Sequence, residues 1–203
     1  MKKRWLTFWT LAGAAGDPEP PWTLLSARYS EPHRAYHTLR HVAHCLDEFD
    51  AVRGLAREPV AIEMALWYHD AVYDPRAKDN EERSAVLATE VASRMGLSAA
   101  RTLRVADLIR VSTHTGLAPD PDAQLFADID LAILGRPPGD FDEYERQVRV
   151  EYGWVPEPAF RAARAAILKS FLDRPSVYGS EFFRRKYEES ARRNLEDSLR
   201  KLR

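Results

Sequence analysis

Apolar side chains recur along this chain at helical spacing over most of its length. Positions three and four apart are apolar in segment after segment, and few stretches alternate with the period of two that strands show. The pattern therefore predicts an all-α chain. The segments with helical spacing are 34–50, 58–72, 78–95, 98–113, 123–134, 140–152, 157–172 and 181–202.

The residues at the ends of these segments support the same boundaries. Pro59 suits the first turn of a helix, and Ser98 is a suitable N-cap. Gly96 and Gly135 suit helix ends, because glycine adopts the left-handed conformation that often follows a last turn. No repeat, low-complexity run or Gly/Ser linker divides the chain, so we expect one domain over residues 1–203.

Residues 1–21 form a distinct N-terminal segment. Trp5, Phe8, Trp9 and Ala12 have helical spacing, which predicts an amphipathic docking helix, followed by a Pro-rich connector over residues 17–21. The alternative is a secretory leader, because a basic start precedes a short apolar run and small residues. No other apolar stretch approaches ~18–20 residues, so we expect no membrane span and a cytoplasmic location.

The composition narrows the classes of partner. The 203 residues are 45% hydrophobic, and 30 basic residues balance 31 acidic ones to a net charge of −1. This balance argues against a nucleic-acid binder that works through bulk charge. Small molecules, proteins and self-association into a homo-oligomer stay open. The single cysteine, Cys45, excludes an internal disulfide and a multi-cysteine zinc site, and we expect it to pack beside an apolar face.

The histidines are the chemical clue, because all of them lie in the first 114 residues. They are His33, His37, His41, His44, His69 and His114. In the predicted helix 34–50, His37 and His41 lie four residues apart and should project side by side. Such a pair can share a metal, or place one ligand beside one proton donor. We expect His33 and His44 to be solvated bystanders.

Carboxylates occur in the most apolar segments. His69 and Asp70 end the segment 58–72, which is apolar nearly all round, and a buried carboxylate there requires a compensating cation or an ordinary His–Asp hydrogen bond. Asp128 and Asp130 lie in a second apolar run. Residues two apart on a helix do not face the same way, so only one of these two should reach a shared site. Alternatively, either carboxylate could simply lie near the start of a helix, where the helix dipole favours negative charge.

These candidates follow one another along the chain as His41, then His69-Asp70, then a later aspartate. This order resembles that of the HD-domain superfamily of metal-dependent phosphohydrolases. The phrase Tyr36-His37-x-x-x-His41 also resembles the Tyr-His-Asn-x-x-x-His segment of cyclic-nucleotide phosphodiesterases, which are relatives within that superfamily. A bacterial group of predicted HD phosphohydrolases is more similar still, over residues 5–200. The phrases that carry this resemblance are Tyr29-Ser-Glu-Pro-x-Arg34-x-Tyr36-His37, His69-Asp-Ala-Val-Tyr-Asp74 and Asp128-Ile-Asp130-Leu-Ala-x-Leu-Gly135.

The resemblance implies a single-domain HD-type helical bundle with one or two divalent metal ions, which could be Mn, Mg, Fe, Co, Ni or Zn. The ligands that it implies are His41, His69, Asp70 and Asp130. Asp130 is preferred because Asp-Leu-Ala is similar to the Ala-Asp-Leu-Ser phrase of the phosphodiesterases, and Asp128 is the second choice.

The resemblance also implies two catalytic roles. His37 would protonate the leaving oxygen, although Thr38 stands where the phosphodiesterases have Asn. Asp70 could bridge to a second ion in addition to holding the first.

We expect substrate contacts from four further residues. Arg34 precedes His37 by about one turn and is the first choice for phosphate. Asn80 and Glu81 could bind substrate or a second metal, with a plain helix start as the alternative. His114 is either a substrate contact or a histidine favoured by the end of a helix.

The expected activity is hydrolysis of a small phosphate ester, with a nucleotide phosphomonoester as the leading substrate. The alternatives are a phosphodiesterase acting on cyclic or oligonucleotides, and a catalytically silent metal- or nucleotide-binding sensor or interaction domain.

Overall fold

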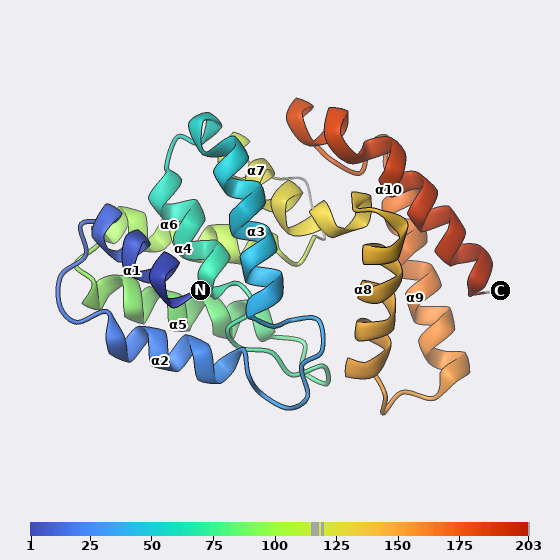
Figure 1. Cartoon of the computed structure of the whole chain (residues 1–203), viewed down its shortest axis with the longest axis horizontal. Helices are drawn as coiled ribbons and strands as arrows, with labels where there is room; N and C mark the ends of the chain where they lie inside the picture. Colours follow the sequence, from blue (N-terminus) through green and yellow to red (C-terminus); the bar gives the residue numbers. More distant parts are fainter. Residues whose placement is uncertain (115–117, 119, 203) are drawn as a thin grey trace. The chain divides into compact units, whose positions relative to one another are not determined.

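All regular secondary structure is helical in residues 1–114, 118 and 120–202, which the computed structural model describes. The prediction of an all-α chain is confirmed over these residues (Figure 1). The helices are α1 (Lys2–Leu11), α2 (Glu19–Arg28), α3 (Leu39–Val52), α4 (Pro59–Tyr68), α5 (Asn80–Arg94), α6 (Ala99–Val111), α7 (Pro121–Asp130), α8 (Pro138–Glu151), α9 (Glu157–Leu172) and α10 (Glu181–Lys201), with short 3-10 helices η1 (Arg53–Leu55) and η2 (Leu131–Gly135).

The chain divides into two compact units, Met1–Ala127 and Asp128–Arg203. The first unit contains α1 to α6 and most of α7. The second contains the end of α7, η2 and α8 to α10. The expectation of one domain over residues 1–203 stays a prediction.

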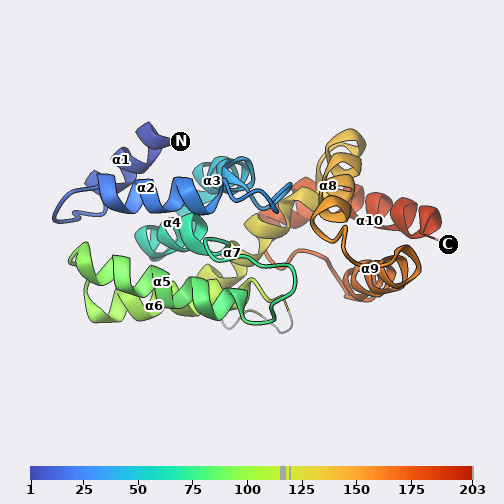
Figure 2. The same ribbon diagram turned by 90° about the horizontal axis from the view of Figure 1, so that it is seen from below.

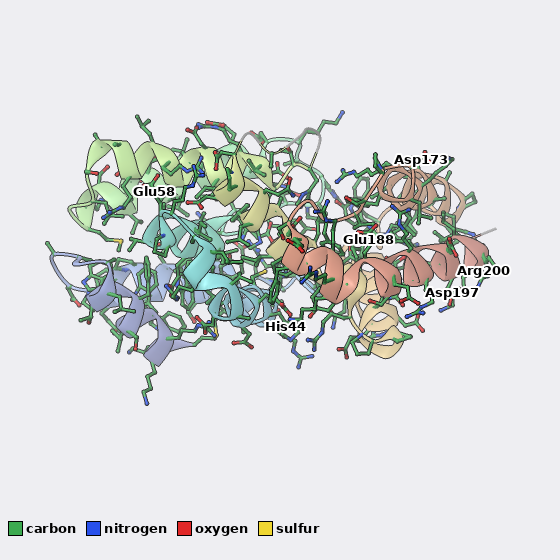
Figure 3. The ribbon with its side chains drawn as sticks, turned by 90° about the horizontal axis from the view of Figure 1, so that it is seen from above. His44, Glu58, Asp173, Glu188, Asp197 and Arg200 are labelled. Carbon is green, nitrogen blue, oxygen red and sulfur yellow. The ribbon has the colours of Figure 1, made fainter. Side chains whose placement is uncertain are left out.

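Helix α4 is the centre of the first unit. It contacts α1 and α3 on one side and α5 and α6 on the other (Figure 2). Every residue from Ala61 to Tyr68 is buried, as its nearly continuous apolar sequence predicts. The start of α4, marked by Glu58 in Figure 3, is capped by Asp122, whose carboxylate accepts the backbone N–H groups of Arg57 at 2.9 Å and of Glu58 at 2.8 Å.

Helix α1 packs against this centre through its aromatic face. Trp5, Phe8 and Trp9 are buried, and the ring of Trp5 meets that of Trp67 edge-on at 5.5 Å. The next segment corrects a prediction. Residues 17–21 are not simply a connector, because α2 begins at Glu19 and carries its two prolines in the first turn. Proline is tolerated there because the first N–H groups of a helix have no partner within the helix.

The predicted helix 34–50 was wrong at its start. Helix α3 begins at Leu39, and Thr38 is its N-cap, whose hydroxyl accepts the backbone N–H of Arg40 at 3.3 Å. His37 therefore lies in the turn before the helix. The other predicted segments agree with α4 to α10 to within a few residues, and α9 spans the predicted 157–172.

In the second unit, α10 packs against η2 and α9. A groove of about 670 Å³ between α9 and α10 is lined by aliphatic and charged side chains, among them Asp173 and Arg200 (Figure 3). Neither histidine nor cysteine lines the groove, so the clustered histidines that suggest chemistry lie elsewhere.

Among the residues described, no helix combines the length and the apolar character needed to cross a bilayer.

Candidate metal centre

Two buried histidines meet in the first unit. His41 lies in the first turn of α3, and His69 is the C-cap residue of α4. Only 4% of His41 and 1% of His69 are exposed. Their Nε2 atoms are 3.0 Å apart, although the residues are 28 positions apart in the sequence. The packing of α3 against α4 therefore creates the pair.

Asp70 adds a carboxylate oxygen to the two nitrogens. Its Oδ2 lies 3.0 Å from Nε2 of His69 and 3.5 Å from Nε2 of His41. Two ligand atoms, each about 2.1 Å from one ion, are about 3.0 Å apart at a right angle and about 3.4 Å apart at the tetrahedral angle. The three atoms therefore have the spacing of neighbouring ligands on a single ion.

The tautomer of His69 is also suited to metal binding. Its Nδ1–H donates a hydrogen bond to the carbonyl of Leu66 at 3.0 Å. In a neutral ring this leaves the lone pair on Nε2, the atom that faces His41 and Asp70. Histidine ligands are commonly oriented by such a bond from the second ring nitrogen.

Cys45 lies beside the pair, one helical turn after His41. Its Sγ is 3.7 Å from both ring nitrogens of His41, and it is buried. The ligand atoms of His41, Cys45 and His69 all lie within 4.8 Å of one another, so this buried cluster could hold a metal ion. Cys45 lies on the buried side of α3, in agreement with the expectation that it packs beside the apolar face.

The charge balance favours an ionised Asp70. Burial alone would raise the pKa of its carboxyl group. The positive charge that the imidazoles of His69, His37 and His41 carry when protonated outweighs that effect and, in the metal-free protein, holds the pKa well below its usual range. An ionised carboxylate with two imidazole nitrogens is a donor set for a divalent cation of intermediate hardness.

The segment that follows the His69–Asp70 pair is irregular, and side chains hold its backbone. Arg34 donates to the carbonyls of Asp70 at 2.7 Å and Ala71 at 3.3 Å. The Ser84 hydroxyl accepts the Val72 N–H at 3.0 Å and donates to the Val72 carbonyl at 3.2 Å. These contacts explain why α4 ends at Tyr68 although its apolar pattern continues, since buried backbone groups need partners of one kind or another.

Two further side chains complete this clamp. The Nε2–H of His33 donates to the carbonyl of Tyr73 at 2.7 Å, although the side chain is exposed to solvent as expected. Asn80 accepts the Asp74 N–H at 3.0 Å and donates to the Asp74 carbonyl at 2.9 Å. We call Arg34, His33, Asn80 and Ser84 the backbone clamp.

His37 lies next to the cluster, but not for the predicted reason. It is outside α3, so the argument from two histidines four apart on one helix was wrong. Its ring instead stacks on Tyr73 with centroids 4.2 Å apart, and it meets the ring of His41 at 6.1 Å. His44, by contrast, is exposed on α3, as expected for a bystander (Figure 3).

The remaining predicted substrate contacts are spread over the first unit. Asn80 and Glu81 open α5, and both are partly exposed. His114 follows the end of α6 in the left-handed backbone region, with φ at 53°, and its N–H donates to Val111. Arg34 belongs to the clamp. A substrate role for each of these four residues stays a prediction.

The two downstream aspartates, Asp128 and Asp130, differ in burial. Asp128 is fully buried, and its carboxylate accepts the N–H groups of Gly179 at 2.9 Å and Ser180 at 2.7 Å, at the start of α10. Asp128 therefore has a structural role in the second unit. Asp130 is half-buried and ends α7. Its role as a metal ligand stays a prediction.

Sequence reasoning missed Ser84 and Tyr73. Ser84 lies in the buried stripe of α5 with Ala85 and Ala88, and a serine within such a stripe indicates a bond to another part of the chain. No signal in the sequence indicated that Tyr73 would support the ring of His37.

No family model, no curated protein and no solved structure matches this chain.

Proposed function

We propose that this chain is a metal-dependent phosphohydrolase that cleaves a small phosphate ester, with a nucleotide phosphomonoester as the substrate class. The observation that carries the proposal is the triangle of ligand atoms from His41, His69 and Asp70, with edges of 3.0, 3.0 and 3.5 Å. The resemblance of the sequence to HD phosphohydrolases supports the same activity.

These residues would hold a divalent ion through two imidazole nitrogens and one carboxylate oxygen. When bound, such an ion supplies Lewis acidity, which activates water for attack on phosphorus and offsets negative charge on the phosphoryl oxygens. The bond from Nδ1–H of His69 to Leu66 leaves Nε2 available to the ion when the ring is neutral. In the metal-free protein, the imidazoles in their charged form lower the pKa of Asp70. We propose Asp130 as a further ligand on the basis of the sequence.

His37 would act as the general acid. Its imidazole is held on the ring of Tyr73, 6.1 Å from the ring of His41, and it is partly exposed. In this role it gives a proton to the ester oxygen as the bond from phosphorus to that oxygen breaks. The predicted substrate contacts are Arg34, Asn80, Glu81 and His114.

The first experiment measures metal content and turnover together. Purified protein is loaded with Mn²⁺, Mg²⁺, Fe²⁺, Co²⁺, Ni²⁺ or Zn²⁺ and screened against nucleotides and simple phosphate esters. We expect one or two ions per chain and phosphate release that disappears in Asp70→Ala. His44→Ala is the matched control, because His44 lies on the same helix as His41 but is exposed. Equal metal content and turnover in wild type and Asp70→Ala would contradict the proposal.

The same screen separates the alternatives. Cleavage of cyclic or oligonucleotides without release from monoesters would indicate a phosphodiesterase. Tight metal or nucleotide binding with no turnover would indicate a sensor or interaction domain.

His37 has a test of its own. With alkyl phosphates, whose leaving groups need a proton, His37→Ala should slow turnover by about 10²–10⁴-fold. With nitrophenyl phosphate it should have little effect, and metal content should not change. Equal slowing for both classes of ester would argue against a proton-donor role.

A further inference from the structure

The side chain of Arg34 is fully enclosed near the candidate metal centre, and it donates hydrogen bonds to one carboxylate and three backbone carbonyls. None of its side-chain surface is exposed. Its Nε donates to Glu31 at 3.0 Å, Nη1 donates to the carbonyls of His37 at 3.0 Å and Asp70 at 2.7 Å, and Nη2 donates to the carbonyl of Ala71 at 3.3 Å. Four donor contacts are therefore made by a group that has five N–H donors.

These bonds join two segments that are far apart in the sequence. One is the turn that presents His37, and the other is the backbone immediately after His69, 36 residues from Arg34 at Asp70. Because the guanidinium group is planar and rigid, its bonds to both segments fix the position of one relative to the other.

Aromatic rings hold the guanidinium itself in place. Its Cζ lies 5.2 Å from the ring centroid of Tyr29 and 5.4 Å from that of Tyr73. Tyr73 is also the ring on which His37 stacks. Arg34 therefore contacts both the backbone and the ring support of the proposed general acid.

This arrangement argues against direct contact with a phosphate. To reach a substrate, the guanidinium would have to leave a buried position and abandon three carbonyls and a carboxylate, and buried polar groups left unpaired are costly. Its hydrogen bonds instead hold the backbone that surrounds the site.

We propose that Arg34 is a positioning residue, which sets the turn of His37 against the His69–Asp70 pair so that acid and metal ligands keep one geometry. This proposal rests on the proposed function for its catalytic consequence. It departs from the expectation that Arg34 binds substrate phosphate.

The test compares Arg34→Lys with Arg28→Lys. Lysine keeps the charge but lacks the planar fork, so it cannot bridge the same carbonyls. Arg28 is the matched control, because it also contacts Glu31, at 3.5 Å, yet its side chain is 40% exposed and, within the described part of the chain, it does not bond to the segment after His69. Glu31→Gln is a milder second variant, which weakens the anchor of Arg34 if Arg34→Lys does not fold.

Two measurements are made on each full-length variant. The first is Mn²⁺ affinity by competition with a chelating dye, where loss of a residue that orients ligands typically weakens binding about 10–100-fold. The second is amide hydrogen exchange of residues 70–73 in the metal-free protein. We expect Arg34→Lys to weaken Mn²⁺ binding within that range and to speed exchange, Glu31→Gln to do both less strongly, and Arg28→Lys to do neither.

The outcomes that overturn the proposal are distinct. A lower melting temperature with unchanged Mn²⁺ affinity and unchanged exchange at 70–73 would mean that Arg34 serves stability alone. A raised KM with unchanged Mn²⁺ affinity would mean that it contacts substrate. If wild type binds no metal, the proposed function fails, whereas faster exchange confined to Arg34→Lys and Glu31→Gln would still support the positioning of the backbone.

Discussion

Replacing Asp128 with asparagine tests whether this aspartate has a structural role or is a metal ligand. Both Asp128 and Asp130 are candidates from sequence, and the carboxylate of Asp128 accepts the backbone N–H groups of Gly179 and Ser180. Asp128→Asn should therefore destabilise the protein without changing its metal content. Asp130→Asn should lower the metal content.

The magnitude follows from the two hydrogen bonds. Each is charge-assisted, and a bond of this kind contributes about 1.5–3 kcal/mol. Asparagine keeps one carbonyl acceptor but turns an NH₂ group toward the other backbone donor, which then loses its charge-assisted partner. We expect a loss of about 2–4 kcal/mol in the free energy of unfolding. For a chain of this size that corresponds to a melting temperature lower by about 5–15 °C.

The assay is thermal unfolding in chelator, followed by measurement of bound Mn²⁺ after reloading. Asp142→Asn is the control, because Asp142 is exposed and pairs with Lys201 at the surface. Its effect should stay within about 1 kcal/mol. If Asp128→Asn loses Mn²⁺ and keeps its metal-free melting temperature, Asp128 is the ligand and the reasoning from its hydrogen bonds is refuted.

Three other perturbations give defined results. Ser84→Ala leaves both backbone polar groups of Val72 without their partner, and should cost about 1–3 kcal/mol for each group in urea unfolding. Gly135→Ala places a Cβ on the side chain of Tyr187 and should cost about 1–3 kcal/mol through overpacking. Because the imidazoles lower the pKa of Asp70, its ionised carboxylate stabilises the metal-free fold above the ordinary carboxyl pKa, and this stability is lost as pH falls through the lowered value. The stability difference between wild type and Asp70→Asn should therefore shrink in acid, measured by urea unfolding in chelator.

Each of these predictions has a control or a contrary result. Ser170→Ala removes an exposed hydroxyl bonded only to its own helix and should change stability by less than about 0.5 kcal/mol. Gly139→Ala meets no atom within 4 Å and should be neutral or stabilising. Comparable losses in test and control would refute the first two predictions. A difference for Asp70→Asn that grows on acidification would refute the third.

Local signals in the sequence predicted most of the helices. The apolar stripe and the flanking proline, serine and glycine residues fixed α4, α5, α6 and α9 to within a few residues. Thr38 is a good N-cap, so the sequence also contains a signal for the start of α3 at Leu39. Helix α2 was missed because its prolines read as a connector, although they occupy its first turn.

The site was only partly predictable, because its contacts are distant in sequence. His41, His69 and Asp70 stood out as polar groups in apolar helices, and the structure brings them together. The partners of Asp128 lie 51 and 52 residues downstream, so no local pattern could show that its carboxylate is already engaged. The role of Arg34 depends on carbonyl groups, which no sequence pattern displays.

The backbone clamp also bears on the order of folding. Its ties from Arg34 to Asp70 and from His33 to Tyr73 close chain segments of 36 and 40 residues, and contacts of such length form after local helices because closing a long loop costs chain entropy. Neither α3 nor α4 alone presents the complete triangle of ligands. The capacity to capture an ion should thus appear at the end of folding, so that metal uptake during refolding would time the moment at which the first unit is complete.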